Sequence, residues 1–518
     1  MKFSNTNLYL AAILLLFIFT RLYKISDIPQ SVYWDEASIG YNAYSIAQTG
    51  KDEWGKFLPL SFEAFGEYKL PVYIYATAFS VKIFGLNEFA LRIPAVLFSF
   101  GVVILTFFLA KKLTKDYLSG LLTAFFVVTS QWFFIISRTG FEATAGLLFY
   151  ISGIYFFILA LENKRNLILI SIIGFILSLY SYNSFLIITP MTLLILAAFY
   201  FKKLFFFVQD NLVLSVTCLI ILAIGGFGTL NSLITGRISR LDEVGIFIAY
   251  NQRKYQTFIA VAANYLSHFN PNFLFFTGDG NWRSQQPKFG PINLIYLPLI
   301  ILGISYILRK RKKEYFLVLL LLLIAPIPAS ITRESPHALR SISAVPALAF
   351  IEALGALKLA SYFTNKKYVF SIIVGLTLIS FLIYYQNFTT FYTRNTANDW
   401  QYFYKKINLD YKKEFNNFDH ILISDRNNQP YIFSLFYLQY DPYKFRSEVK
   451  YNQTIRRATS LVSSFDKFIF TNIDYYQLPF GKSLIFTHPS DKMDEIKWRE
   501  AILNPDGTVG GYVYEYKK

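Results

Sequence analysis

Long apolar runs recur along the chain from Leu8 to Asn387, and the short turns between them carry many of the lysine and arginine residues. A helix needs ~20 mostly apolar residues to cross a bilayer. Beyond Asn387 the pattern changes to short β-like and helix-like runs mixed with polar residues. We therefore predict a polytopic α-helical membrane protein, with a small α/β domain outside the membrane at residues 389–518.

About eleven segments are apolar enough to be transmembrane helices, and a count of about twelve or thirteen also fits. The segment Pro71–Gly85 is short and contains Lys82, so we expect it to lie at the membrane interface. The predicted spans are Leu8–Leu22, Ala90–Ala110, Tyr117–Ser137, Ala143–Leu161, Leu167–Tyr182, Phe185–Phe201, Leu212–Leu230, Ile292–Leu308, Tyr315–Ile331, Ser341–Ala360 and Tyr368–Phe388.

The basic turns predict the orientation, because cytoplasmic loops of membrane proteins carry an excess of Lys and Arg. With these spans, every basic turn from Lys111 to Lys367 falls on the side of the N-terminus. The N-terminus is thus predicted in the cytoplasm and the C-terminal domain outside the cell, in a multi-pass protein of the cell membrane. The membrane domain, residues 1–388, then has large outer loops at 23–89 and 231–291.

The amino-acid composition limits which kinds of partner the protein can bind. Hydrophobic residues make up 54% of the 518 positions and charged residues only 16%, which is unlike a soluble domain. The net charge of +17 lies in turns between apolar runs, so it indicates membrane topology and not nucleic-acid binding. The only cysteine is Cys218, which excludes an intramolecular disulfide.

Charged motifs follow one another in the first outer loop and at the start of the next span. They are Asp35-Glu36, then Glu67, Lys69 and Pro71, and then Arg92-Ile93-Pro94. In this order they resemble the polytopic glycosyltransferases of the GT-C class, particularly bacterial relatives of protein O-mannosyltransferases and lipid A aminoarabinose transferases. The resemblance is clear over the first third of the chain. Leu70 departs from the commonest family form, which has a second proline there.

The resemblance implies that Asp35 is the general base that acts on an acceptor hydroxyl, in a single displacement with inversion at the anomeric carbon. A positioned carboxylate in this role contributes ~10²-fold to ~10⁴-fold to the rate. Asp35 is also a suitable N-cap for a following helix. Glu36 could orient Asp35, bind a divalent metal together with Glu67 or His268, or only complement the helix dipole. The sequence identifies no definite cofactor, and a divalent metal is an open alternative.

A lipid-phosphate leaving group calls for cations on the outer side, where its negative charge develops. Each candidate could instead anchor the chain at the interface or pair with a neighbouring carboxylate. The candidates are Lys69, Arg92, Arg138, Arg333, His337 and Arg340. Tyr41, Glu67, His268 and Asp279 are further candidates for contacts with the substrate or for the structure of the outer loops.

These observations predict a membrane glycosyltransferase that moves a sugar from a polyprenyl-phosphate donor to a hydroxyl of a protein, lipid or glycan acceptor at the outer face. Membrane lipids are also expected partners. One alternative is a flippase for lipid-linked glycans, but such transporters often have two similar halves, which the chain lacks. Another is a polysaccharide polymerase or ligase, which would depend on Arg and His in an outer loop, such as Arg333, His337 and Arg340, but the early Asp35-Glu36 pair favours the transferase.

Overall fold

The computed structural model describes residues 3–162, 164–234, 245–246, 254–452 and 460–518, so the predicted outer loop 231–291 is described only in part. Contacts between residues divide the chain into two compact units. The first, the helical unit, consists of Met1–Tyr23 and Ala95–Gln386. The second, the α/β unit, consists of Lys24–Pro94 and Asn387–Lys518. The stretch Lys24–Pro94, which contains most of the predicted first outer loop, and the C-terminal region therefore fold together.

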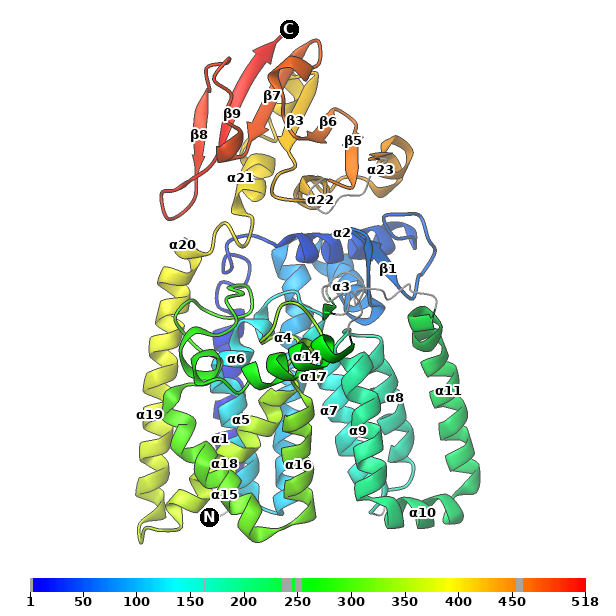
Figure 1. Ribbon diagram of the computed structural model, residues 1–518, viewed down its shortest axis with the longest axis vertical. Helices are drawn as coiled ribbons and strands as arrows, with labels where there is room; N and C mark the ends of the chain where they lie inside the picture. The colour runs from blue at the N-terminus through cyan, green and yellow to red at the C-terminus, as the bar shows by residue number, and fades with distance from the viewer. Residues whose placement is uncertain (1–2, 163, 235–244, 247–253, 453–459) are drawn as a thin grey trace. The chain divides into compact units, whose positions relative to one another are not determined.

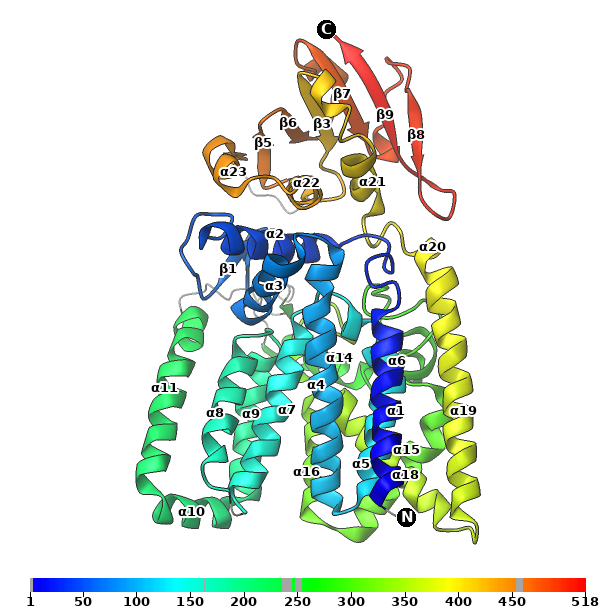
Figure 2. The same cartoon turned by 180° about the vertical axis from the view of Figure 1, so that it is seen from behind.

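The helical unit is built from long apolar helices that run side by side (Figures 1 and 2). Within it, α7 packs against α8 and α15 against α18. A β-carbon at Gly355 of α18 would lie 1.8 Å from the carbonyl oxygen of Leu299 in α15, so glycine is what allows these two backbones to meet. The helices are α1 (Phe3–Leu22), α4 (Glu88–Thr114, which begins in the α/β unit), α5 (Tyr117–Thr129), α6 (Gln131–Phe134), α7 (Ala143–Ala160), α8 (Leu167–Leu179), α9 (Phe185–Phe199), α10 (Phe201–Asp210), α11 (Leu212–Ile234), α14 (Lys254–Ser267), α15 (Leu297–Lys310), α16 (Lys313–Ile324), α17 (Ile327–Ser330), α18 (Ala344–Ala360) and α19 (Lys366–Asn387).

The apolar helices confirm a polytopic membrane protein. Among the described residues, four helices are by themselves long and apolar enough to cross a membrane, and six spans result if each of two bent helix pairs is counted as one. Shorter apolar helices occupy other predicted spans, and the total of about eleven stays a prediction. The four long helices are Glu88–Thr114, Ala143–Ala160, Lys313–Ser330 and Lys366–Asn395.

The C-terminal part of the α/β unit contains a seven-stranded sheet in the order β4-β5-β6-β3-β7-β9-β8, which confirms the predicted α/β domain. The central strand β3 runs parallel to both of its neighbours, β6 and β7. The strands are β3 (His420–Ser424), β4 (Lys450–Tyr451), β5 (Val462–Phe465), β6 (Phe468–Thr471), β7 (Lys482–Thr487), β8 (Glu500–Leu503) and β9 (Val509–Lys517).

Aromatic side chains join this sheet to its helices, α21 (Tyr402–Asp410) and α22 (Pro430–Leu438). Tyr404 stacks on Phe433 with ring centres 4.8 Å apart, and Tyr411 meets Phe486 of β7 edge-on at 5.1 Å. Such aromatic pairs contribute ~0.5–1.5 kcal/mol each beyond the area that they bury. The first pair joins the two helices to each other, and the second joins the end of α21 to the sheet.

The first outer loop forms the rest of the α/β unit. It contains α2 (Trp34–Thr49), the antiparallel hairpin of β1 (Phe62–Ala64) and β2 (Glu67–Lys69), and α3 (Pro71–Phe84). Helix α2 packs against both α3 and α22. A β-carbon at Gly40 would lie 2.5 Å from the ring of Phe436 in α22, so α2 and α22 are in close contact.

Candidate active site

The first group of candidate residues lies at the start of α2. Asp35 is in its first turn, and the β1–β2 hairpin brings Lys69 to it, so that Lys69 Nζ donates to Asp35 Oδ1 at 2.6 Å. Glu67 Oε1 is 3.7 Å from the same ammonium group. The Lys69 side chain is 5% exposed and that of Asp35 21%. The carboxylate of Asp35 is therefore both held in place and accessible to a small group.

Glu36, the next residue, is held by Arg92, and both side chains are fully buried. Arg92 Nε and Nη2 donate to the two oxygens of Glu36 at 3.1 and 3.0 Å. The same guanidinium also donates to the backbone carbonyls of Ile25, Pro29 and Ser31 at 2.9, 2.9 and 2.6 Å. All three guanidinium nitrogens of Arg92 thus donate hydrogen bonds within the protein. Arg92 therefore links the loop before α2 to α2 and does not face a substrate phosphate.

Tyr41 is also buried in the α/β unit. Its hydroxyl donates to the carbonyl oxygen of Tyr440 at 3.3 Å, and its ring meets that of Phe445 edge-on at 5.9 Å. These contacts place Tyr41 in the packing between α2 and the C-terminal region.

Glu53 is a buried acid that the sequence analysis did not single out. Its two oxygens accept from the Asn42 side-chain amide at 2.8 Å and the Tyr431 hydroxyl at 3.1 Å. Burial raises the pKa of Glu53 to about 8, so the acid is mostly neutral at pH 7. Nothing in the sequence pattern pairs Glu53 with a tyrosine far along the chain.

This pKa predicts how stability depends on pH. A folded-state pKa of about 8 exceeds the unfolded value of about 4.5, so the folded form holds the extra proton between these values. Stability from this group is complete below pH ~4.5 and is lost as the pH rises through ~8. We expect Glu53→Gln, which stays neutral, to show a smaller fall in Tm between pH 6 and 9 than the wild type. Thermal unfolding in detergent measures this, and equal slopes would contradict the assignment.

The second group of candidate residues lies in the helical unit, where the loop 332–340 is held by two side chains. Asp279 Oδ2 accepts from the Ala338 backbone N–H at 2.6 Å and lies 3.6 Å from His337 Nδ1. Only 1% of the Asp279 side chain is exposed, and burial raises its pKa to about 6. The Asp279 carboxylate therefore binds a backbone N–H group and is not accessible to a sugar.

His268 holds the neighbouring peptide of the same loop. Its Nε2 accepts from the His337 backbone N–H at 3.2 Å, so the proton of the neutral ring lies on Nδ1, which is 2.9 Å from the Asn264 carbonyl oxygen. Burial lowers the pKa of His268 and favours this neutral form. Two consecutive backbone N–H groups are thus fixed by side chains from the second outer loop.

The cations of this loop are placed by their own contacts. Arg340 Nη1 donates to Thr332 Oγ1 at 2.7 Å, and its Nη2 lies 3.2 Å from Glu334 Oε2. Arg333 is exposed, and its Nε donates to the Gly245 carbonyl oxygen at 3.3 Å. Arg333, His337 and Arg340 are therefore gathered on one short loop with defined geometry.

Arg138 has different surroundings. It is fully buried in the helical unit, at the end of a short 3-10 turn (Ile136–Arg138). Its Nη1 and Nη2 donate to the carbonyl oxygens of Thr20 and Tyr23 at 3.0 and 2.8 Å. These bonds tie the turn to the end of α1.

The described part of the chain holds no group of three or more His, Cys, Asp or Glu side chains that could bind a metal ion. The carboxylate of Glu36, one of the candidate metal ligands, forms an ion pair with Arg92. Glu67 lies near Lys69, and the Nε2 of His268 accepts a backbone N–H. Glu36 and His268 thus have protein partners of their own in this structure.

The comparisons with known proteins confirm the resemblance to GT-C membrane glycosyltransferases that the sequence shows. Residues 11–230 match the family dolichyl-phosphate-mannose-protein mannosyltransferase. A comparison with curated protein sequences finds no match.

Two of the similar solved structures are of ArnT from Cupriavidus metallidurans. The apo form has 10% sequence identity and a TM-score of 0.56, covering 99% of this chain and 98% of that one. The form bound to undecaprenyl phosphate has 10% identity, the same coverage and a TM-score of 0.55. The archaeal oligosaccharyltransferase AglB from Archaeoglobus fulgidus, in complex with an inhibitory peptide and a dolichol-phosphate, has 13% identity and a TM-score of 0.52, covering 83% of this chain and 63% of that one.

Proposed function

We propose that the protein transfers a sugar from a polyprenyl-phosphate carrier to a hydroxyl of a protein, lipid or glycan acceptor at the outer face of the cell membrane. The observation that carries this proposal is the accessible Asp35 carboxylate, held by Lys69 at 2.6 Å within the ordered motifs of the first outer loop. The N-terminus lies in the cytoplasm and the C-terminal domain outside. The undecaprenyl phosphate of ArnT and the dolichol-phosphate of AglB support a carrier of this kind.

The reaction is a single displacement at the anomeric carbon of the donor. Asp35 accepts the proton of the acceptor hydroxyl as its oxygen forms the new bond to that carbon. The bond from the anomeric carbon to the phosphate oxygen breaks, its electron pair leaves with the polyprenyl phosphate, and the configuration inverts. Lys69 fixes the orientation of the Asp35 carboxylate, so the proton acceptor is in place before the acceptor arrives.

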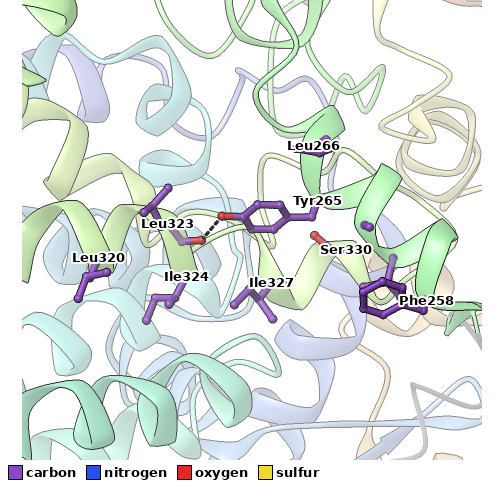
Figure 3. Close-up of a pocket in the computed structure, with 10 residues that line it drawn as sticks. Phe258, Tyr265, Leu266, Leu320, Leu323, Ile324, Ile327 and Ser330 are labelled. Atoms are coloured by element: carbon purple, nitrogen blue, oxygen red, sulfur yellow. Dashed lines mark hydrogen bonds between the residues drawn. The ribbon is translucent and has the colours of Figure 1, made fainter. Parts of the chain in front are cut away.

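A cavity in the helical unit supports a lipid donor. It has a volume of about 520 Å³ and lies between α14 and the α16–α17 segment (Figure 3). Ser330, which lines it, lies two residues before Thr332, and the Asn264 amide donates to both carbonyl oxygens at 3.2 and 3.0 Å. The cavity thus adjoins the loop that carries Arg333 and Arg340. The side chains that line it are mostly apolar: Phe258, Val261, Ala262, Tyr265, Leu266, Leu320, Leu323, Ile324, Ile327 and Ser330.

Such a cavity accommodates a polyprenyl tail, and the adjoining cations attract its phosphate. We therefore expect Ala262→Trp, which places a bulky side chain in the cavity, to raise KM for a long-chain polyprenyl-phosphate sugar ~10-fold, and KM for a two-isoprene analogue by less than ~2-fold. Steady-state kinetics in detergent measure both values. The control is Ala263→Trp, because Ala263 is the next residue but is exposed and does not line the cavity. Equal increases for both donors would show that the cavity does not hold the tail.

The function is tested with protein reconstituted in liposomes. Radiolabelled polyprenyl-phosphate sugars are supplied with cell-envelope acceptors, and both the label in the acceptor and the released polyprenyl phosphate are measured. Transfer with one polyprenyl phosphate released for each sugar supports the proposal. Label that crosses the bilayer while still attached to its lipid, with no acceptor labelled, would overturn it in favour of a flippase.

A further inference from the structure

Two adjacent residues in the segment before α21 contact the surroundings of Asp35. The first is Trp400, which is fully buried and whose indole N–H donates to the Tyr392 hydroxyl at 2.8 Å. Its ring centre lies 5.8 Å from the guanidinium carbon of Arg92. This distance is within the range of a cation–π contact. Trp400 therefore packs against the arginine that holds Glu36.

The second residue is Gln401, whose side-chain amide joins two distant segments. Its Oε1 accepts from the Trp34 backbone N–H at 3.1 Å, and its Nε2 donates to the Asn427 carbonyl oxygen at 2.7 Å. Trp34 is the first residue of α2, and the first N–H groups of a helix have no partner within that helix. Asn427 follows β3. Gln401 thus caps the catalytic helix from the C-terminal region.

Asp35 and its two neighbours along the chain are therefore each held by a contact. The peptide N–H of the residue before it is held by Gln401, the carboxylate of the residue after it by Arg92, and its own carboxylate by Lys69. We propose that Trp400 and Gln401 are positioning residues for Asp35, through which the C-terminal region contributes to the active site. This inference rests on the proposed role of Asp35 as general base.

The physical reason is the sensitivity of proton transfer to geometry. If the amide of Gln401 is removed, the Trp34 N–H loses its partner and the first turn of α2 can open. A misplacement of a catalytic group by ~1 Å can lower the rate ~100-fold, even when the mutated residue does not touch the substrate. The effect should appear in kcat, because neither residue is a candidate ligand of the donor or the acceptor.

The test compares Gln401→Met with Gln439→Met. Gln439 is a matched control, because its backbone is also left-handed, with φ of 52° against 51° for Gln401. Its side-chain amide also bonds to the backbone of the first outer loop, but as a donor to the Leu86 carbonyl oxygen at 2.9 Å and away from the start of α2. We expect Gln401→Met to lower kcat by ~10-fold to ~100-fold, with donor and acceptor KM changed less than ~2-fold, and Gln439→Met to leave kcat within ~2-fold. Equal losses in both variants would overturn the proposal.

Amide hydrogen exchange gives a second readout of the positioning role, and it does not require turnover. Peptides covering residues 33–37 should exchange faster in Gln401→Met than in the wild type and in Gln439→Met. Gln401→Glu keeps an acceptor for the Trp34 N–H but loses the donor to the Asn427 carbonyl, so residues 33–37 should exchange more slowly in it than in Gln401→Met. Faster exchange of these residues in the glutamate variant than in the methionine variant would contradict the capping role. If the wild type transfers no sugar, the proposed function is wrong. If Gln401→Met exchanges at residues 33–37 as slowly as the wild type, only the positioning role is wrong.

Discussion

Replacement of Asp35 by asparagine is expected to lower sugar transfer ~10²-fold to ~10⁴-fold while the protein still binds its donor. Asparagine has nearly the same shape as aspartate, but its amide cannot accept the proton of the acceptor hydroxyl. The contact between Asp35 and Lys69 joins the side chains of one hairpin and one helix, so its loss should not unfold the α/β unit. Single-turnover transfer and donor binding, measured on the same preparation, separate the two effects.

A matched control for this experiment is Glu63→Gln. Glu63 lies in the same outer loop and also pairs with a lysine, Lys56, at 3.0 Å, but on an exposed part of β1. Its replacement should leave transfer within ~2-fold of the wild type, since exposed ion pairs contribute little. If Asp35→Asn transferred sugar at the rate of Glu63→Gln, another group would have to be the base.

The largest loss of stability is expected for Arg92→Met. This change leaves the carboxylate of Glu36 buried without its partner and three backbone carbonyls without their donor. Removal of one member of a buried ion pair costs ~3–5 kcal/mol. The Tm in detergent should therefore fall sharply, and Arg92→Lys should restore little, because a single ammonium group cannot reproduce the planar set of bonds.

Two comparisons make this prediction specific. Lys112→Met removes an exposed ion pair with Glu162 and should change the free energy of unfolding by less than ~1 kcal/mol. The double variant Glu36→Gln with Arg92→Met should be more stable than Arg92→Met alone, because it removes the uncompensated charge. A double variant no more stable than the single one would show that the carbonyl contacts of Arg92 dominate.

Much of the fold follows from local patterns, because long apolar runs predict helices and short runs of apolar, β-branched and aromatic residues predict strands such as β3 and β7. The order of motifs in the first outer loop singled out Asp35 and Lys69, but it predicted Lys69 as a ligand of the donor phosphate and did not predict its contact with Asp35. The sequence could not distinguish a cation that faces substrate from one that binds carbonyls, and Arg92 and Arg138 are of the second kind. The pairing of Gln401 with Trp34 follows no pattern, because their separation of 367 residues leaves no periodic signal.

The α/β unit is assembled from two stretches of chain, Lys24–Pro94 and Asn387–Lys518, with most of the helical unit made between them. At the usual ~5–20 residues per second, a ribosome needs on the order of tens of seconds to reach the second stretch. The first stretch therefore emerges long before Gln401 and the sheet exist to complete the unit. The order of synthesis thus delays a complete α/β unit until the helices between its two stretches have been made, and a chain that terminates early lacks the contact that Gln401 makes with the start of α2.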